Sequence, residues 1–219
     1  MLIGLKFVQT LRKESMKRTF IEAIEHRRSH YSLSAAMAVN YQEIVRCIER
    51  IILATPSAYN SQSSRIVVLF GIHHLCLWGI VKQCIKNIVS PDVYTISREK
   101  IDNCFASGCG TVLFYEDTKV VEQMKVEYQS YADKFDTYSA HTSAMHQFAI
   151  WTALEDMGFG ASLQHYNPLI DNLVAEQWNI DKSWQLIAQM PFGTPLDTPK
   201  AKEQIQPLSE RYLVFYDDL

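Results

Sequence analysis

The strongest helical pattern in the chain begins near residue 40. Apolar residues recur there on one helix face, as Ile44, Val45, Ile48, Ile51 and Ile52. Asn40, followed by Glu43 at the third position of the expected helix, indicates a capping box and predicts where this helix begins. Pro56 predicts its end, because a proline ring interrupts the helical backbone.

Further stretches with helical periodicity are 19–29, 75–89, 118–135, 139–158 and 167–178. The stretch 139–158 has little polar surface, so we expect a helix that is central or lies at an interface, with Gly158 as its C-cap. In the last stretch, Asn167 predicts an N-cap and Pro168 the first helical residue.

Short runs rich in β-branched and aromatic residues predict strands at 65–71, 108–117, 159–166, 184–195 and 209–218. Between the last two runs, the polar, proline-rich segment 194–207 predicts an extended arm. Helices and strands alternate irregularly, without a repeat or an interdomain linker. This order favours one α+β domain, with a sheet between helical layers, over a doubly wound sheet.

Composition narrows the possible functions. The 219 residues are 47% hydrophobic and 21% charged, which is typical of a globular protein. A net charge of −3 does not suggest binding to nucleic acid or to an anionic membrane. The five cysteines are odd in number and lack C-x-x-C spacing, which predicts a reducing compartment such as the cytoplasm rather than a disulfide framework or a zinc ribbon.

Residues 1–15 are mildly apolar, but Lys6 interrupts the run and no small-residue cleavage site follows. The segment is too short and too polar for a signal peptide or a membrane span. We interpret 1–15 as an N-terminal extension and 16–219 as the single folded domain.

The sequence lacks the motifs of several well-known cofactor, metal and catalytic sites. The G-C-G of 108–110 opens a strand, and the G-F-G of 158–160 follows a helix, so neither matches the dinucleotide fingerprint. His141 and His146 are five apart and do not share a helix face, which argues against a metal site. No phosphate loop and no G-x-S-x-G elbow occurs in the sequence.

Two polar motifs remain open to two interpretations. The H-R-R-S of 26–29 either places cations at a helix C-terminus or forms an arginine fork with a serine hydroxyl that holds a phosphate. The S-A-Y-N-S-Q of 57–62 is either an ordinary polar turn or a ligand wall, because carboxamides both donate and accept hydrogen bonds.

The order of the motifs resembles the flavin-dependent nitroreductase family. R-R-S ends the first helix, and P-S-x-x-N-S-Q follows at a helix-to-strand junction. "ALEDMGFGASLQHYNPLI" and the closing "PFGTP…PLSERYLVF" continue the resemblance through nearly the whole chain after Met16. "GASLQHYNP" is similar to a small fungal and bacterial subgroup, typified by the yeast fatty-acid-repression-mutant protein and the copper-inducible bacterial nitroreductases.

The resemblance implies a nitroreductase-like three-layer fold, with a mostly antiparallel sheet, in an intertwined homodimer that binds FMN at the subunit interface. Arg27 and Ser29 would then contact the FMN phosphate or its surroundings, while Arg28 would serve packing or an ion pair. Asn60 and Gln62 would face the isoalloxazine ring. The apolar helix segment 146–154 would form the dimer core.

The resemblance also assigns residues near the C-terminus. Leu163, Gln164 and His165 would pass near the reactive N5 of the flavin, and Arg211 would grip the phosphate. Tyr31 stands where the family often has a lysine, so a positive charge near the pyrimidine edge is missing. Ser63 and Ser64 stand where the family often has Pro-Trp, so we expect substrate preference to diverge there.

The implied activity is ping-pong hydride transfer. NADH or NADPH would reduce the flavin at N5, and a small planar acceptor, a nitroaromatic or a quinone, would then take the electrons. No metal, nucleic acid or membrane is expected to take part. The alternative is a flavin-binding sensor or storage protein with little turnover, which Tyr31 motivates. A dimeric interaction protein that has lost the cofactor has less support, because the arginines expected to grip phosphate are retained at both ends of the chain.

Overall fold

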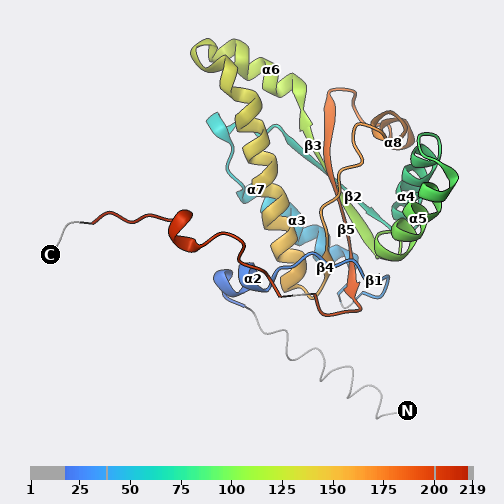
Figure 1. Ribbon diagram of the computed structural model, residues 1–219. Coiled ribbons are helices and arrows are strands. Elements are labelled where there is room, and N and C mark those ends of the chain that lie inside the picture. Colours follow the sequence, from blue (N-terminus) through green and yellow to red (C-terminus); the bar gives the residue numbers. More distant parts are fainter. Residues whose placement is uncertain (1–17, 38, 200, 217–219) are drawn as a thin grey trace.

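The computed structural model describes residues 18–37, 39–199 and 201–216, in which helices surround a central sheet (Figure 1). The expected extension at 1–15 lies outside the described residues. In chain order the elements are α2 (Phe20–His26), β1 (Leu33–Ser34), α3 (Tyr41–Ala54), η1 (Ala58–Asn60), β2 (Ser64–Phe70), α4 (Gly71–Lys86), α5 (Pro91–Cys104), β3 (Gly110–Asp117), α6 (Thr118–Glu127), η2 (Gln129–Lys134), α7 (Phe135–Asp156), β4 (Gly160–Ala161), α8 (Asp171–Trp178), β5 (Trp184–Pro195) and η3 (Leu208–Glu210).

β3 is the central strand of an antiparallel sheet. It pairs with β2 on one side and β5 on the other, which gives the order β1-β5-β3-β2, and β4 also pairs with β5. All eight residues of β3 are buried, as expected for a strand covered on both faces. In its pairing with β5 the register shifts between Phe114, opposite Ala188, and Tyr115, opposite Leu186, so β5 has one extra residue, a bulge, at this point.

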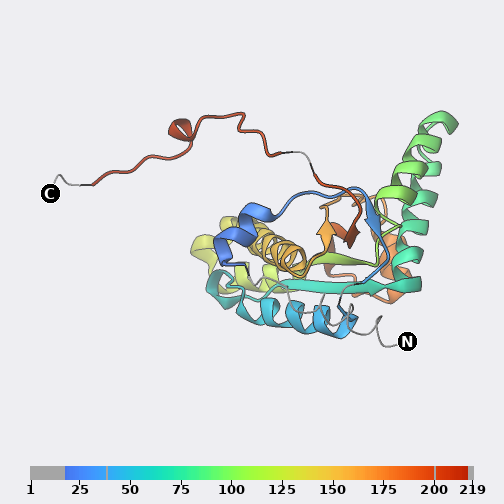
Figure 2. The same ribbon diagram turned by 90° about the horizontal axis from the view of Figure 1, so that it is seen from below.

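Alternating side chains of β3 divide the core into two layers. Leu113 and Tyr115 pack with helices α4, α5 and α8, whereas Val112 and Phe114 pack with α3 and α7. Because side chains alternate along a strand, one apolar sequence fills both layers. The predicted α+β fold, with a mostly antiparallel sheet between helical layers, is confirmed (Figures 1 and 2).

The helix predicted after Asn40 is present as α3. The Asn40 side chain accepts a hydrogen bond from the Glu43 N–H at 3.0 Å, as predicted. The reciprocal half of the capping box differs, because the Glu43 carboxylate bonds the Asn40 side-chain amide at 2.9 Å rather than its backbone. The helix ends at Ala54, before Pro56.

The long apolar helix is α7, and its start lies at Phe135 instead of 139. Ile150 and Leu154 are buried in the layer it shares with the sheet. Met157 forms the C-cap, and Gly158 follows it with φ +89°, so the predicted cap is displaced by one residue.

Two predictions within the segment 159–178 differ from the structure. The predicted strand 159–166 forms regular pairs only at Gly160–Ala161, followed by a single bridge from Gln164 to Gln189. Asn167 and Pro168 do not begin a helix, since α8 starts at Asp171 without a side-chain cap. The reason is that the Asn167 oxygen accepts a hydrogen bond from Gln189 of β5 at 3.2 Å.

The predicted C-terminal strand 209–218 is wrong for its described residues. Leu208–Glu210 form a 3₁₀ turn, and residues 211–216 are exposed and outside any strand. A strand needs a neighbouring edge to pair with, whereas this segment leaves the body of the molecule as an extended arm (Figure 2).

Helix α5 was not predicted. Helix α5 is mostly polar, and Ile101 is its only buried residue. It therefore lacks the apolar stripe from which the other helices were predicted. Pro91 after Ser90 was the available signal, because proline is favoured at the first helical position. Within the described residues, no helix has both the length and the apolar content required to cross a membrane.

We expect Asn40→Ala to lower the free energy of unfolding by about 1 kcal/mol, because the α3 N-terminus loses its side-chain acceptor. Asn40→Ser is the control: the serine hydroxyl keeps an acceptor for the Glu43 N–H and brings no second negative charge next to the Glu43 carboxylate, so most of the stability should be retained. Urea unfolding curves measure both. Equal losses in the two variants would show that the cap does not stabilise α3.

Candidate functional site

The R-R-S segment runs from the end of α2 to the edge of the sheet. His30 donates its backbone N–H to the Ala161 carbonyl at 3.0 Å, and Ser29 forms a parallel bridge with Ala161. The segment is therefore attached to β4, directly before Leu163, Gln164 and His165. Two groups of predicted site residues are thus brought to one sheet edge.

A buried carboxylate of α7 holds this segment in place. Glu155 is 3% exposed, and its Oε1 lies 3.0 Å from Nε2 of His30 and 3.6 Å from Nδ1 of His26. Burial raises the pKa of the Glu155 carboxyl, while the hydrogen bond with His30 acts in the opposite direction. Sequence reasoning missed Glu155; the available signal was a glutamate within a helix otherwise poor in charge.

Arg27 lies over an aromatic ring of α7. Its guanidinium lies 4.4 Å from the centroid of the Trp151 ring, a cation–π arrangement. Burial lowers the pKa of Arg27, and the Glu155 charge opposes this shift. Among the described residues, the buried Arg27 Nε has no hydrogen-bond partner. A buried donor without a partner is costly, so this N–H fits a site that an acceptor completes.

Arg28 and Tyr31 behave differently from Arg27. Arg28 donates to the carbonyl groups of Glu25 at 2.6 Å and of Arg27 at 2.9 Å, so its guanidinium is used by the local backbone. Tyr31 is exposed, and so is Ser29.

The S-A-Y-N-S-Q segment forms a loop with unusual backbone angles. Tyr59, Asn60 and Gln62 have positive φ values of 53°, 53° and 50°, which residues with a Cβ rarely adopt. Nε2 of Gln62 donates to Oδ1 of Asn60 at 3.0 Å. Among the described residues, this leaves the Asn60 amide and the Gln62 oxygen for a ligand. Strained backbone of this kind is concentrated at functional sites.

This loop borders its own cavity of about 370 Å³. The lining side chains come from the end of α3, the loop, β2, α7 and β5, and include Ser57, Asn60, Gln62, Arg65, His146 and Trp184. None of residues 27–31 lines it. Ser63 and Ser64, where we expected a missing apolar wall, donate their hydroxyl groups inward to buried Glu116.

The segment 163–165 forms part of its hydrogen bonds with strand β5. The N–H of Gln164 donates to the Gln189 carbonyl at 2.7 Å, and the Gln189 N–H returns a bond at 2.9 Å. The Gln164 N–H is therefore occupied, and the N–H groups of Leu163 and His165 are those that alternate away from β5. Leu163 is half-buried and His165 is exposed.

Arg211 is not brought to either group. It lies on the exposed C-terminal arm, which extends away from the folded body (Figure 1). The predicted site residues therefore fall in three places within one chain: the sheet edge at 27–31 and 163–165, the carboxamide loop at 60–62, and the arm.

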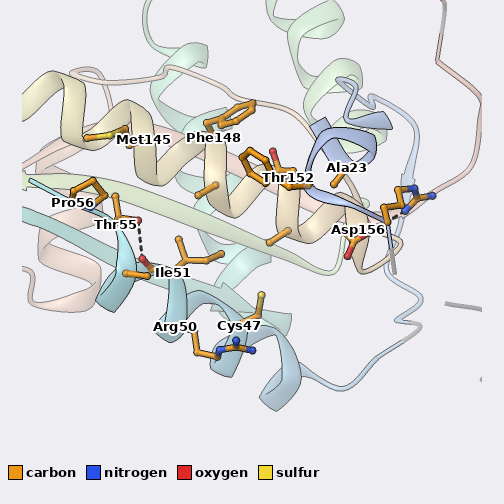
Figure 3. A pocket seen from close by; sticks show the side chains of 15 residues that line it. Ala23, Cys47, Arg50, Ile51, Thr55, Pro56, Met145, Phe148, Thr152 and Asp156 are labelled. Carbon is orange, nitrogen blue, oxygen red and sulfur yellow. Dashed lines mark hydrogen bonds and ion pairs between the residues drawn. The ribbon is translucent and has the colours of Figure 1, made fainter. Parts of the chain in front are cut away.

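A large apolar groove lies between α2, α3 and α7 (Figure 3). Its volume is about 860 Å³, and its lining includes Ala23, Cys47, Ile51, Met145, Phe148 and Thr152. Met145 and Phe148 are 39% and 40% exposed, on a helix that buries Ile150 and Leu154 against the sheet. We call this surface the α3–α7 groove.

We expect Gly160→Ala to lower the free energy of unfolding by about 1–3 kcal/mol through overpacking. A Cβ at Gly160 would lie 2.7 Å from Cβ and Cγ of His30, whose ring is held by Glu155. The control is Gly79→Ala in α4, where nothing lies within 4 Å, so the helix should gain up to about 1 kcal/mol. Urea unfolding of both variants checks the opposite signs.

The chain matches known proteins over most of its length. A family model described as the nitroreductase family matches residues 24–194. The putative nitroreductase HBN1 of Saccharomyces cerevisiae is 35% identical over 190 residues, covering 86% of this chain and 94% of HBN1. Nitroreductase FRM2 of the same yeast is 29% identical over 185 residues, covering 84% of this chain and 91% of FRM2.

Among solved structures, nitroreductase CinD from Lactococcus lactis in complex with chloramphenicol is similar to this chain. The TM-score is 0.80 at 34% identity, covering 90% of this chain and 100% of CinD. CinD in complex with 4-nitrophenol aligns with a TM-score of 0.76, at the same identity and coverage.

Proposed function

The chain belongs to the nitroreductase family and is a nitroreductase-type oxidoreductase, and we propose that it uses FMN as cofactor and NADH or NADPH as electron donor. The observation that carries this proposal is the unpartnered, buried Nε of Arg27 beside Trp151. Arg27 as a whole is half-buried and makes no side-chain hydrogen bond or ion pair among the described residues, so its guanidinium remains a charged donor for an acceptor such as a phosphate oxygen.

The residues present fit the parts of FMN. Arg27 and Ser29 would hold the phosphate, with Arg211 supplied by the arm. The Asn60 amide and the Gln62 oxygen offer a donor and an acceptor, which suits the mixed pyrimidine edge of the ring. The N–H groups at Leu163 and His165 would lie near the ring. When bound, FMN supplies hydride transfer in a ping-pong cycle, which the protein tunes through these contacts.

The site would be completed across a homodimer. Glu155, which holds the R-R-S segment, and Ser139, which donates to Glu116 next to the loop at 2.8 Å, both lie on α7, about 24 Å apart at about 1.5 Å per residue. Within one chain, the R-R-S segment and the carboxamide loop are therefore far apart. The cavity at Asn60 is lined by none of residues 27–31. A second copy covering the α3–α7 groove would bury its exposed apolar side chains and could bring opposite halves together.

The acceptor is proposed to be a small planar nitroaromatic or quinone. The structure of CinD with 4-nitrophenol supports this class, because that relative aligns over its whole length. A flavin-binding sensor or storage protein is the second candidate. Its motivation is Tyr31, which leaves this position without a cation. We place the protein in the cytoplasm, where its five free cysteines would stay reduced.

Purified protein should be yellow and should bleach on anaerobic addition of NADH or NADPH, and a nitroaromatic or quinone should restore the colour. We expect Arg27→Ala to weaken FMN binding by about tenfold or more, since charge-assisted hydrogen bonds are lost. Arg28→Ala is the matched control and should bind FMN normally, because Arg28 contacts its own backbone. Flavin fluorescence titration measures the dissociation constants.

Protein that neither contains nor takes up FMN would contradict the proposed cofactor. Equal effects of the two arginine substitutions would contradict the site assignment. FMN binding without turnover of any nitroaromatic or quinone would favour the sensor or storage candidate.

We expect the protein to sediment as a dimer. Phe148→Glu, which puts a charge in the α3–α7 groove, should produce monomers that have lost FMN, because burying an unpaired charge is strongly unfavourable. Ile96→Glu on α5 is the control, an exposed apolar residue outside the groove. Analytical ultracentrifugation with absorbance at flavin wavelengths measures both properties. A wild-type monomer with bound FMN would rule out the shared site.

A further inference from the structure

The carboxamide loop needs support from the rest of the fold. Tyr59, Asn60 and Gln62 all occupy the left-handed region of backbone space. Residues with a Cβ stay in this region only where surrounding contacts hold them. The contacts that hold this loop therefore decide how Asn60 and Gln62 are presented.

A buried glutamate supplies the main anchor. Glu116, near the end of β3, is 4% exposed and accepts hydrogen bonds from three serine hydroxyl groups. Ser63 and Ser139 donate to the same oxygen, Oε2, at 2.6 Å and 2.8 Å, and Ser64 donates to Oε1. Ser63 and Ser64 directly follow Gln62, whereas Ser139 belongs to α7.

The adjacent carboxylate holds the backbone of the same loop. Asp117 pairs with Arg65 at 3.0 Å, and Arg65 donates to the Gln62 carbonyl at 2.7 Å. The Asp117 N–H donates to the Ser63 carbonyl at 2.9 Å. The loop backbone is thus attached at two successive residues to the end of β3.

The far side of the loop is held by aromatic packing. The Tyr59 ring lies 4.4 Å from that of Tyr128 and 5.5 Å from that of Phe135, measured between centroids. These contacts fix Tyr59, while the carboxylates fix the residues after Gln62. Asn60 and Gln62 lie between the two anchors.

We propose that Glu116 is a positioning residue, which gathers Ser63, Ser64 and Ser139 and so fixes Asn60 and Gln62 in the orientation that receives the flavin ring. The inference rests on the proposed function for the identity of the ligand. Ser63 is 1% exposed with its hydroxyl turned to Glu116, so Ser63 serves as an anchor and does not contact substrate.

The serines offer a matched pair for the test. Ser63→Ala and Ser139→Ala each remove one hydroxyl from the same Glu116 oxygen, so both should lower thermal stability. Only Ser63 lies on the loop. We expect Ser63→Ala to weaken FMN binding by about fivefold or more and Ser139→Ala by less than about twofold.

The midpoint potential of bound FMN is the second measurement. Ser63→Ala should lower it, because loosened carboxamides stabilise the reduced ring less, and Ser139→Ala should leave it unchanged. Glu116→Gln should fall between wild type and Ser63→Ala, because the amide keeps one acceptor oxygen and a serine can turn to accept from its NH₂. Equal shifts in the two serine variants, or none in either, would overturn the proposal.

Hydrogen exchange separates this inference from the cofactor assignment. In protein without FMN, the amides of residues 57–65 should exchange faster in Ser63→Ala than in Ser139→Ala. If the wild type bound no FMN, the proposed function would fail, while this difference in exchange would still support the anchor. Equal exchange rates would remove the anchor whether or not FMN binds.

Discussion

A carboxylate removed from water must find hydrogen-bond donors within the protein, and two buried glutamates of this chain find them in the candidate site. Glu155 bonds His30 beside the R-R-S segment, and Glu116 bonds the two serines that follow the carboxamide loop. Glu155 belongs to α7 near its C-terminal end, and Glu116 of β3 accepts from Ser139 near the N-terminal end of the same helix. The position of each half of the site therefore depends on this one helix and on the sheet beneath it.

The framework that carries these anchors could be predicted from local patterns. The apolar stripe of α3, the β-branched run of β2 and the strand at 184–195 all appear where expected, because the helical periodicity and the β-propensity of these segments agree with the structure that forms. Predictions from local patterns were wrong where a residue distant in the sequence makes the deciding contact. Asn167 was expected to cap a helix, and its oxygen instead accepts from Gln189 of another segment. Similarly, the C-terminal strand needs a pairing edge that no sequence pattern reveals.

In the candidate site, too, some residues could be predicted from local sequence and others could not. R-R-S and N-S-Q could be found in the sequence because their order resembles that of a known family, and the match to the nitroreductase family confirms that the order was informative. Glu155 and Glu116 could not be found in this way. Each is an ordinary glutamate in the sequence, and its role appears only when folding removes it from water and surrounds it with donors.

The contacts of Glu116 also change the interpretation of Ser63 and Ser64, which stand where the family often has Pro-Trp. A proline at this place would restrict the loop through its own ring. Here the restriction comes from hydrogen bonds to the buried Glu116 side chain, which are strong only while water is excluded. A loop held in this way keeps its strained backbone only as long as β3 and the start of α7 stay packed. The conformation of the carboxamide loop therefore depends on core packing at the start of α7, next to the aromatic cluster of Tyr59, Tyr128 and Phe135.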